Sequence, residues 1–218
     1  MAITYSNFLT QVRNFTEVDS NVLSDTLIDQ FIRNVELNVA SKVDYDDLRK
    51  YSNSTCTASN RAVNLPADLI YLRQVRITDG SNNLIFLEKR DQSFISEFNP
   101  DNSTGTPKYY ANYDNYNILL APTPSAAFAI QIQYIKTPPH FNSSTDTILS
   151  QYHENMLLYG VLVECFSYLK GPADMYNLYK NKYDEAIQGF ILQEMGGRRR
   201  DQYVDGVPRV QIPAPNPR

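Results

Sequence analysis

The chain has 218 residues, of which 42% are hydrophobic and 20% are charged, and its net charge is −4. These values are typical of a globular protein with a substantial core, built as one large domain or two small ones. No apolar run approaches the ~18 residues that cross a membrane, and the N-terminus lacks the basic and apolar regions of a signal peptide. The composition therefore argues against membrane and secreted proteins.

Two helices are predicted within residues 1–54. The segment TYSNFLTQVRNF places three apolar residues on one helical stripe, namely Phe8, Val12 and Phe15. A stronger helix follows Ser24, which suits an N-cap, and it keeps a 3.6-residue apolar period as far as Val39. The polar segment YDDLRKYSNST ends this helical part.

A β-rich insertion is predicted over residues 55–140. Apolar alternation in LPADLIYLRQVRITDG indicates a strand that ends in a turn and precedes a second strand in LIFLEKR. Asp91 begins a brief helix. The stretch KYYANYDNYNILLAPTP predicts two short strands around the turn Asp114–Asn115, ended by prolines. The alternation in AAFAIQIQYIKTPP predicts a last strand with one buried face (Phe128, Ile130, Ile132, Tyr134) and one polar face (Ala129, Gln131, Gln133).

Two further helices are predicted over residues 141–195. The stretch ILSQYHENMLLYGVLVECFSYLK is apolar over a wide arc, which indicates one long and central helix. Gly171-Pro172 ends it. The next helix has one apolar face, formed by Met175, Tyr179, Tyr183, Ile187 and Phe190. We expect this helix to stop at Gly196-Gly197.

The order of these segments predicts an α+β fold. The helices on either side of the insertion must pack together, because neither pair alone covers its apolar face. We therefore expect an antiparallel helical bundle of about four helices, an inserted β-rich lobe over residues 55–140 and an extended C-terminal arm over residues 196–218.

The sequence offers no arrangement of residues that is typical of catalysis. The two histidines, His140 and His153, have no partner at a recurring metal-ligand spacing, and both are expected at the surface. Glycine-rich phosphate motifs and a serine elbow are absent from the sequence. The two cysteines, Cys56 and Cys165, favour reduced and buried thiols, although a disulfide between them stays open. We predict that the chain is not an enzyme and holds no cofactor or metal.

The C-terminal arm differs in charge from the rest of the chain. From Gly196 onward it carries five Arg and two Asp, a charge of +3, so the preceding residues carry −7. The run Arg198–Arg200 either grips nucleic-acid phosphates or pairs with carboxylates of a protein partner. The acidic body favours the protein partner, because a general nucleic-acid binder has a broader basic surface.

The arm also has the composition of a docking segment. Its first part mixes arginine with Tyr203 and Val207, which are residue types common at interfaces. In VPRVQIP, Val210 and Ile212 alternate between prolines, so this stretch can dock as an extended strand on another chain. Fully extended, an arm of this length reaches roughly 70–80 Å, which is enough to cross a neighbouring subunit.

Three stretches of the chain together form a recognisable pattern. They are the opening helices, LPADLIYLRQVRI, and LLAPTPSAAFAIQIQYIKTPPHF followed by ENMLLYGVLVECFSYLKGPADMYNLYKNKYDEAIQGF. The last combines an L-x-P-x-P strand, an IQYIKTPP strand and two helices broken at KGPAD. This pattern covers nearly all of residues 1–195 and resembles the head-to-tail adaptor (connector) proteins of tailed bacteriophages.

The resemblance implies a structural virion protein at the head-tail interface, assembled in the cytoplasm of the bacterial host. Such adaptors form a homo-oligomeric ring, typically of twelve subunits, beneath the portal protein. The ring extends the channel through which double-stranded DNA is ejected without sequence-specific contact, and it binds a tail or nozzle protein. An acidic body is compatible with a channel that repels DNA.

The resemblance also implies a role for the arm, because adaptor arms commonly bind the portal. We assign portal binding to the arm residues with interface character, which are Arg198, Arg199, Arg200, Tyr203, Val207, Val210 and Ile212. Gly196 and Gly197 are assigned as the hinge of the arm.

An alternative is a receptor- or carbohydrate-binding module. The chain has 16 Tyr and 10 Phe but no Trp. Four tyrosines, Tyr109, Tyr110, Tyr113 and Tyr116, cluster in the predicted β lobe, where exposed rings would stack on a sugar. The competing interpretation is that these rings fill contacts between strands and between subunits.

Overall fold

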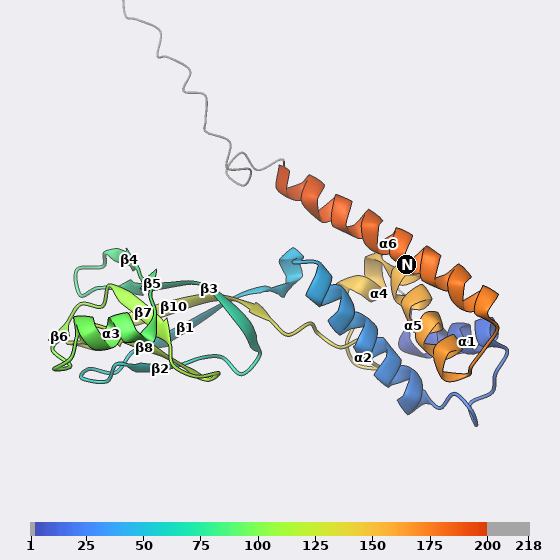
Figure 1. The fold of residues 1–218 in the computed structure, drawn as a ribbon, viewed down its shortest axis with the longest axis horizontal. Helices are drawn as coiled ribbons and strands as arrows, with labels where there is room; N and C mark the ends of the chain where they lie inside the picture. Colours follow the sequence, from blue (N-terminus) through green and yellow to red (C-terminus); the bar gives the residue numbers. More distant parts are fainter. Residues whose placement is uncertain (1–2, 200–218) are drawn as a thin grey trace, which may run out of the picture. The chain divides into compact units, whose positions relative to one another are not determined.

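The computed structural model describes residues 3–199, with side chains as far as Glu194. These residues form two compact units (Figure 1). The helical unit takes its described residues from Met1–Tyr45 and Pro139–Arg218, and the β unit is Asp46–Pro138. The predicted α+β class is confirmed.

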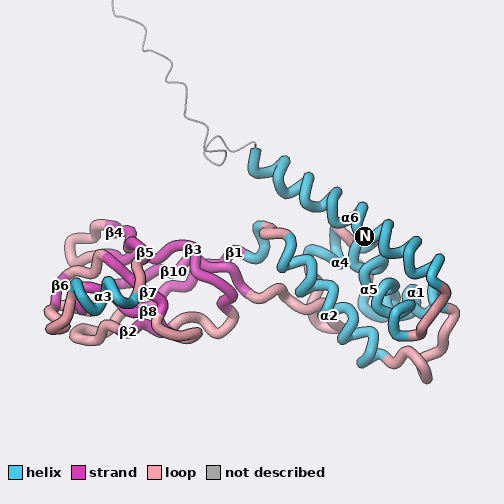
Figure 2. The backbone as a smooth tube through the Cα atoms, viewed as in Figure 1, coloured by secondary structure: helices cyan, strands magenta, loops and turns pink. Residues whose placement is uncertain are grey.

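The helical unit contains five helices within the described residues (Figure 2), namely α1 (Tyr5–Thr16), α2 (Asp25–Lys42), α4 (Ile148–Tyr152), α5 (Glu154–Tyr168) and α6 (Ala173–Arg199). The N-cap predicted at Ser24 is confirmed, since its hydroxyl accepts a hydrogen bond from the Leu27 N–H at 3.3 Å. Thr4 caps α1 in the same way. The unit has one helix more than the roughly four that the sequence predicts.

Helix α5 is central, because it contacts α1, α2, α4 and α6. It buries residues around most of its circumference, which are Met156, Leu157, Leu158, Val161, Leu162, Cys165 and Phe166. All-round burial is typical of a helix inside a core. The predicted face of α6 is also confirmed, with Tyr179, Tyr183, Ile187 and Phe190 buried and Met175 half-buried.

A glycine permits the close approach of three helices at the middle of α5. A Cβ atom on Gly160 would lie 2.7 Å from Cγ1 of Val35 in α2 and 2.8 Å from Cε2 of Tyr183 in α6. Real Cβ atoms do not make contacts this short, so any other residue here must push α2 or α6 away. The hydrogen at Gly160 therefore sets the spacing of the helical core.

Two predicted helix boundaries are wrong. The long helix predicted from Ile148 is interrupted at His153, whose backbone leaves the helical region (φ −129°, ψ 38°) and separates α4 from α5. The His153 ring instead packs against Phe190, with ring centroids 4.5 Å apart. Helix α6 does not stop at Gly196-Gly197 but continues to Arg199. Tertiary packing overrides local propensity at the first site.

The β unit is built from two four-stranded sheets and a helix. The first sheet has the order β1 (Arg49–Thr55), β10 (Ala129–Lys136), β3 (Leu69–Thr78), β4 (Leu84–Phe86) and is antiparallel. The second has the order β2 (Ala62–Asn64), β8 (Asn117–Ala121), β7 (Tyr109–Asn112), β5 (Glu88–Lys89), with β5 parallel to β7. Two short parallel strands, β6 (Thr104–Gly105) and β9 (Thr123–Pro124), complete the unit together with a 3-10 turn at Asp46–Leu48.

The core of the β unit lies between the two sheets. Val75, Ile77, Ile130, Ile132 and Tyr134 of the first sheet form one cluster with Tyr110, Ile118 and Leu120 of the second. The other face of the second sheet packs against α3 (Gln92–Phe98), through Ala111, Leu119, Ala121 and Ile95. The alternation predicted for β10 is confirmed, because its buried residues face this core while Ala129, Gln131 and Gln133 are not buried.

Candidate interaction site

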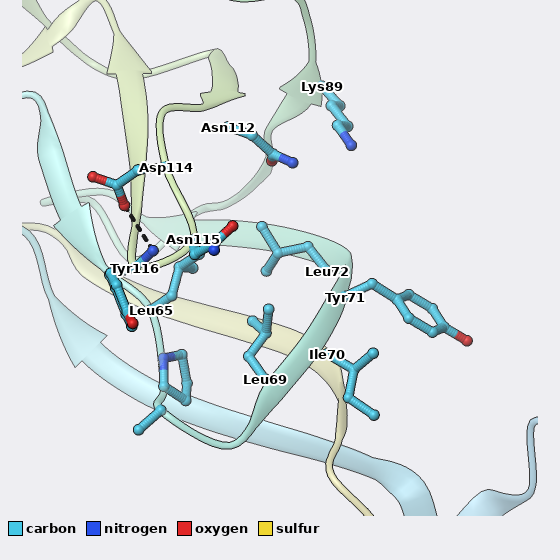
Figure 3. Close-up of a pocket in the computed structure, with 12 residues that line it drawn as sticks. Leu65, Leu69, Ile70, Tyr71, Leu72, Lys89, Asn112, Asp114, Asn115 and Tyr116 are labelled. Atoms are coloured by element: carbon cyan, nitrogen blue, oxygen red, sulfur yellow. Dashed lines mark hydrogen bonds between the residues drawn. The ribbon is translucent and has the colours of Figure 1, made fainter. Parts of the chain in front are cut away.

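A groove with a volume of about 440 Å³ lies in the β unit (Figure 3). Three parts of the chain line it, and their side chains are Leu65, Pro66, Ala67, Leu69, Ile70, Tyr71 and Leu72 before and in β3, Lys89 in β5, and Asn112, Asp114, Asn115 and Tyr116 around the β7–β8 turn. One wall is mainly apolar and the opposite wall is polar. Such mixed grooves suit an extended peptide, which has a polar backbone and alternating side chains.

Strand β3 is paired along its length on one side only, and two register shifts interrupt the ladder on that side. Strand β10 pairs with it from Leu69 to Thr78, whereas β4 pairs only with Arg76–Thr78. The Leu87 N–H donates to the Val75 carbonyl at 2.9 Å and closes this short ladder. Within the described residues, no strand covers the same edge from Leu69 to Gln74. This open edge borders the groove, where four consecutive residues of β3 line it (Figure 3).

The apolar wall is fixed by the carboxylate of Asp68, which lies between Ala67 and Leu69 in the chain. Asp68 accepts hydrogen bonds from the buried Tyr134 hydroxyl at 2.7 Å and from the Lys50 ammonium at 2.8 Å. Its backbone carbonyl accepts from the Thr137 N–H at 2.7 Å. Burial alone raises the pKa of Asp68, but the bonds from Lys50 and Tyr134 outweigh it and lower the pKa. The loop before β3 is thereby tied to β1 and β10.

The polar wall is fixed by the β7–β8 turn, which the sequence predicts at Asp114–Asn115. The Asp114 carboxylate accepts from the Asn117 side chain at 3.1 Å and from the Tyr116 N–H at 2.6 Å, the bond drawn in Figure 3. These bonds lower the pKa of Asp114, with the Asn117 side chain contributing most. Both walls therefore exist before any ligand binds.

The four tyrosines of the alternative function do not form one exposed platform. Tyr110 is buried between the sheets. Tyr109 packs edge-on against Phe94 and Phe98, with ring centroids 5.2 and 5.1 Å apart. Only Tyr113 and Tyr116 are exposed. Tyr109 therefore packs on α3 and Tyr110 fills the core between the sheets, so neither ring belongs to an exposed platform.

Exposed apolar side chains also occur outside the groove. Leu84 and Phe86 on the edge strand β4 are 56% and 57% exposed. On α6, Leu178 and Leu192 are 44% and 68% exposed. Single exposed apolar side chains are normal on a protein surface, but the neighbouring Leu84 and Phe86 on β4 form a candidate contact surface for another protein.

The helical unit holds a cluster of charged groups around His140. The His140 Nδ1 lies 2.8 Å from Oε2 of Glu36, and its Nε2 lies 3.1 Å from Oδ2 of Asp29. Glu36 also accepts from the Phe141 N–H at 2.8 Å and lies 3.6 Å from the Arg33 guanidinium, and the Tyr5 hydroxyl donates to Asp29 at 2.9 Å. The surface position predicted for His140 is only partly correct, because its side chain is 27% exposed and its ring contacts the buried carboxylate of Glu36.

The electrostatics of this cluster favour a bound proton. Burial alone lowers the pKa of His140, but the hydrogen bonds to Glu36 and Asp29 and their charges outweigh it, so the pKa is raised. Burial raises the pKa of Glu36 more than its hydrogen bonds lower it. His153 behaves in the opposite way, since burial lowers its pKa. His153 is half-buried, so the surface position predicted for it is also only partly correct.

Within the described residues, the structure shows neither a metal site nor a helix that could span a membrane. No group of three His, Cys, Asp or Glu side chains there could hold a metal ion. None of the described helices combines the length and the apolarity that a bilayer crossing requires. Cys56 and Cys165 are both buried and free, which answers the question that the sequence leaves open.

The predicted arm residues lie at and beyond the limit of the described chain. The backbone of Gly196, Gly197, Arg198 and Arg199 forms the end of α6. Arg200, Tyr203, Val207, Val210 and Ile212 lie outside the described residues. Portal binding by this segment therefore stays a prediction, as does a hinge role for the glycines.

Comparison with known protein families identifies the chain. The family model described as SU10 adaptor protein matches residues 3–209, which covers both units and continues beyond α6. The chain belongs to the SU10 adaptor protein family. This family comprises phage head-to-tail adaptors, as the resemblance in the sequence indicates. A comparison with curated proteins finds no match.

Membership in the SU10 adaptor family gives the chain a structural role in a bacteriophage virion, at the interface between head and tail. It implies contacts with portal and tail components and a non-enzymatic role.

The groove beside β3 was not predicted from the sequence. The only signal for it is the continuous apolar run LIYL at the start of β3, of which Ile70 and Tyr71 remain exposed.

Proposed function

We propose that this SU10 adaptor forms a ring of twelve copies beneath the portal protein. The ring extends the DNA channel, binds a tail or nozzle protein on its other side, and lets the genome pass without sequence-specific contact. The copies assemble in the cytoplasm of the bacterial host. The observation that carries the proposal is the family match over residues 3–209.

The distribution of exposed apolar residues supports assembly. Leu84 and Phe86 lie on the β unit, while Leu178 and Leu192 lie on the helical unit. A subunit in a closed ring has two neighbours and therefore needs more than one apolar contact surface. Ring formation would cover side chains that a monomer leaves in water.

Electron microscopy of the purified full-length chain tests the ring. We expect closed rings, either directly or after mixing with the portal protein. The variant Leu192→Asp is expected to weaken ring formation, whereas Glu154→Gln, a change at another helical position, is expected to leave it intact. A chain that stays monomeric in the presence of its portal contradicts the proposal.

We further propose that the C-terminal segment binds the portal, with Arg198, Arg199 and Arg200 as its electrostatic anchor. Arginine forks bind carboxylates in a bidentate way, and loss of one such contact weakens binding strongly. Tyr203, Val207, Val210 and Ile212 supply apolar contact area in the arm, and Gly196 and Gly197 give the segment freedom to turn.

Portal capture by variants of the full chain tests the segment. Replacing the three arginines with alanine, or deleting residues 198–218, is expected to abolish capture while the circular dichroism spectrum is kept. The charge-matched control replaces Lys108, Lys180 and Lys182, which are exposed elsewhere, and it is expected to bind normally. Normal portal binding by the deletion variant would contradict the assignment of portal binding to this segment.

A further inference from the structure

We propose that the groove beside β3 binds the segment Val207–Pro213 of a second copy of this chain, as a strand added to the open edge of β3. The choice of a second copy rests on the proposed ring, in which every copy has neighbours. Because Val207–Pro213 occupies the groove in this proposal, the arm contacts the portal only through Arg198, Arg199, Arg200 and Tyr203.

The geometry of the first sheet provides the binding edge. Strand β4 occupies the outer side of β3 only beside Arg76–Thr78. A strand placed beside Leu69–Gln74 would continue the line of β4 along the same edge. Strand addition of this kind obtains affinity from backbone hydrogen bonds and specificity from alternating side chains.

The sequence of the segment fits an edge position. Val210 and Ile212 alternate with Arg209 and Gln211, so one set of side chains is apolar and the other is polar. Apolar side chains can pack on Leu65, Leu69 and Leu72, which lie partly buried against the core. The polar side chains of Arg209 and Gln211 can reach the opposite, polar wall of the groove.

The prolines of the segment are compatible with this arrangement. Pro208 and Pro213 stand at its two ends, and a proline at the end of an edge strand removes only a terminal ladder bond. The exposed rings of Tyr71 and Tyr116 line the groove. Aromatic-lined grooves are the usual binding sites of proline-containing extended segments.

Charge supports the same pairing. The segment from Gly196 onward carries +3 and the remainder of the chain carries −7. The segment is therefore attracted to the body of any copy, and the attraction weakens as salt is raised. Within the groove, the exposed Asp114 carboxylate is available to Arg209, while Lys89 lies at another part of the lining.

A peptide-binding measurement tests the groove without requiring a ring or a portal. The receptor is the full chain with Val210→Asp and Ile212→Asp, which disables its own segment, and the probe is a fluorescent peptide of residues 203–218. We expect saturable binding, weakened at least about tenfold by Ile70→Asp or Tyr71→Ala in the receptor. Tyr51→Ala, an exposed position on β1 at the other edge of the same sheet, is the matched control and is expected to leave peptide binding unchanged.

Two outcomes would overturn the groove assignment: no binding of the peptide to the receptor, or equal loss of binding in the Tyr51→Ala control. These outcomes leave the ring and the portal contact untouched, because electron microscopy and portal capture test those separately. Circular dichroism of the Ile70 and Tyr71 variants confirms that they are folded, which their exposed positions favour.

Disulfide trapping tests whether the segment comes from a second copy. One chain carries Ile70→Cys, another of different tag length carries Ile212→Cys, and the two are mixed and oxidised. The expected product is a disulfide-linked pair of one long and one short chain, absent when Tyr51→Cys replaces Ile70→Cys. A chain carrying both cysteines that links only within itself would overturn the second-copy assignment.

Discussion

The carboxylate of Glu36 in α2 lies 2.8 Å from the imidazole Nδ1 of His140, a residue 104 positions further along the chain. The Glu36 side chain is only 1% exposed. The same carboxylate accepts the Phe141 N–H. One buried acid therefore fixes both the side chain and the backbone of the segment that leads to α4.

Loss of this contact is expected to destabilise the helical unit. His140→Ala leaves the Glu36 carboxylate buried with one partner fewer, which costs about 1.5–3 kcal/mol in the free energy of unfolding. Urea denaturation of the two single variants His140→Ala and Glu36→Gln and of the double variant measures the coupling. The exposed pair of Glu88 and Arg90, 2.8 Å apart, provides the control, since Glu88→Ala is expected to cost less than about 0.5 kcal/mol. Additive effects of the two changes would contradict a direct coupling.

The two histidines are expected to titrate on opposite sides of the ordinary pKa. The pKa of His140 is raised above 6.5 and that of His153 is lowered below it. His140 therefore contributes stability that is complete below the unfolded pKa of 6.5 and is lost as the pH rises through its folded value. His153 has the opposite sign, because its folded state resists protonation and the fold loses stability as the pH falls below 6.5.

Proton NMR can follow both rings, since the chain has two histidines. The ring resonances of the native protein are expected to titrate with one midpoint above and one below 6.5. His140→Gln should remove the upper midpoint and His153→Gln the lower. The titration of His140 reports the whole cluster, because Glu36, Asp29, Arg33 and Tyr5 all lie around it. Two coincident midpoints would contradict the arrangement.

Alanine at two glycines is expected to act in opposite directions. Gly160→Ala places a methyl group against Val35 and Tyr183, and overpacking of this kind costs about 1–3 kcal/mol, more than the helix propensity of alanine restores. Gly189→Ala, in α6, meets nothing within 4 Å and should stabilise the helix by about 0.5–1 kcal/mol. Thermal unfolding of both variants measures the difference. Equal melting temperatures of the two variants would show that α2 and α6 accommodate the added methyl group without a loss of stability.

The two thiols are expected to be inert in the native protein. Burial, with a smaller contribution from the Glu164 carboxylate, raises the pKa of Cys165 to about 12. Burial also raises the pKa of Cys56. Because the thiolate is the reactive form, neither cysteine should react with a disulfide reagent near neutral pH until urea unfolds the chain. Rapid reaction of a native thiol would contradict the burial of that residue.

Most of the correct predictions came from periodic patterns in the sequence. The N-cap at Ser24, the alternation in β10 and the apolar face of α6 follow from local spacing, so a short window of sequence contains the signal. Strand β1 escaped prediction because RKYSNST is polar and lies at the edge of its sheet, where Tyr51 is exposed. An edge strand without a buried face has no period-two pattern to detect.

Long-range contacts account for the rest. The break at His153 depends on Phe190, and the inward position of His140 depends on Glu36. No local pattern encodes a partner so far along the chain. One signal was present, since Glu36 stands beside Val35 in the apolar stripe of α2, and a carboxylate on a buried face needs a partner. The groove was missed because it arises where β4 pairs with only the end of β3, whereas β10 pairs along most of it.

The pairing of β1 with β10 has a consequence for how such chains diversify. These are the first and last strands of the β unit, and their ladder begins where Arg49 faces Ile135. The polypeptide therefore enters and leaves this unit at neighbouring points, closed by its own backbone bonds. A module with adjacent ends can be replaced by another of different length or sequence while the helical unit keeps its core. Exchange of β units between related adaptors would thus give this module a new surface while the helical scaffold stays the same.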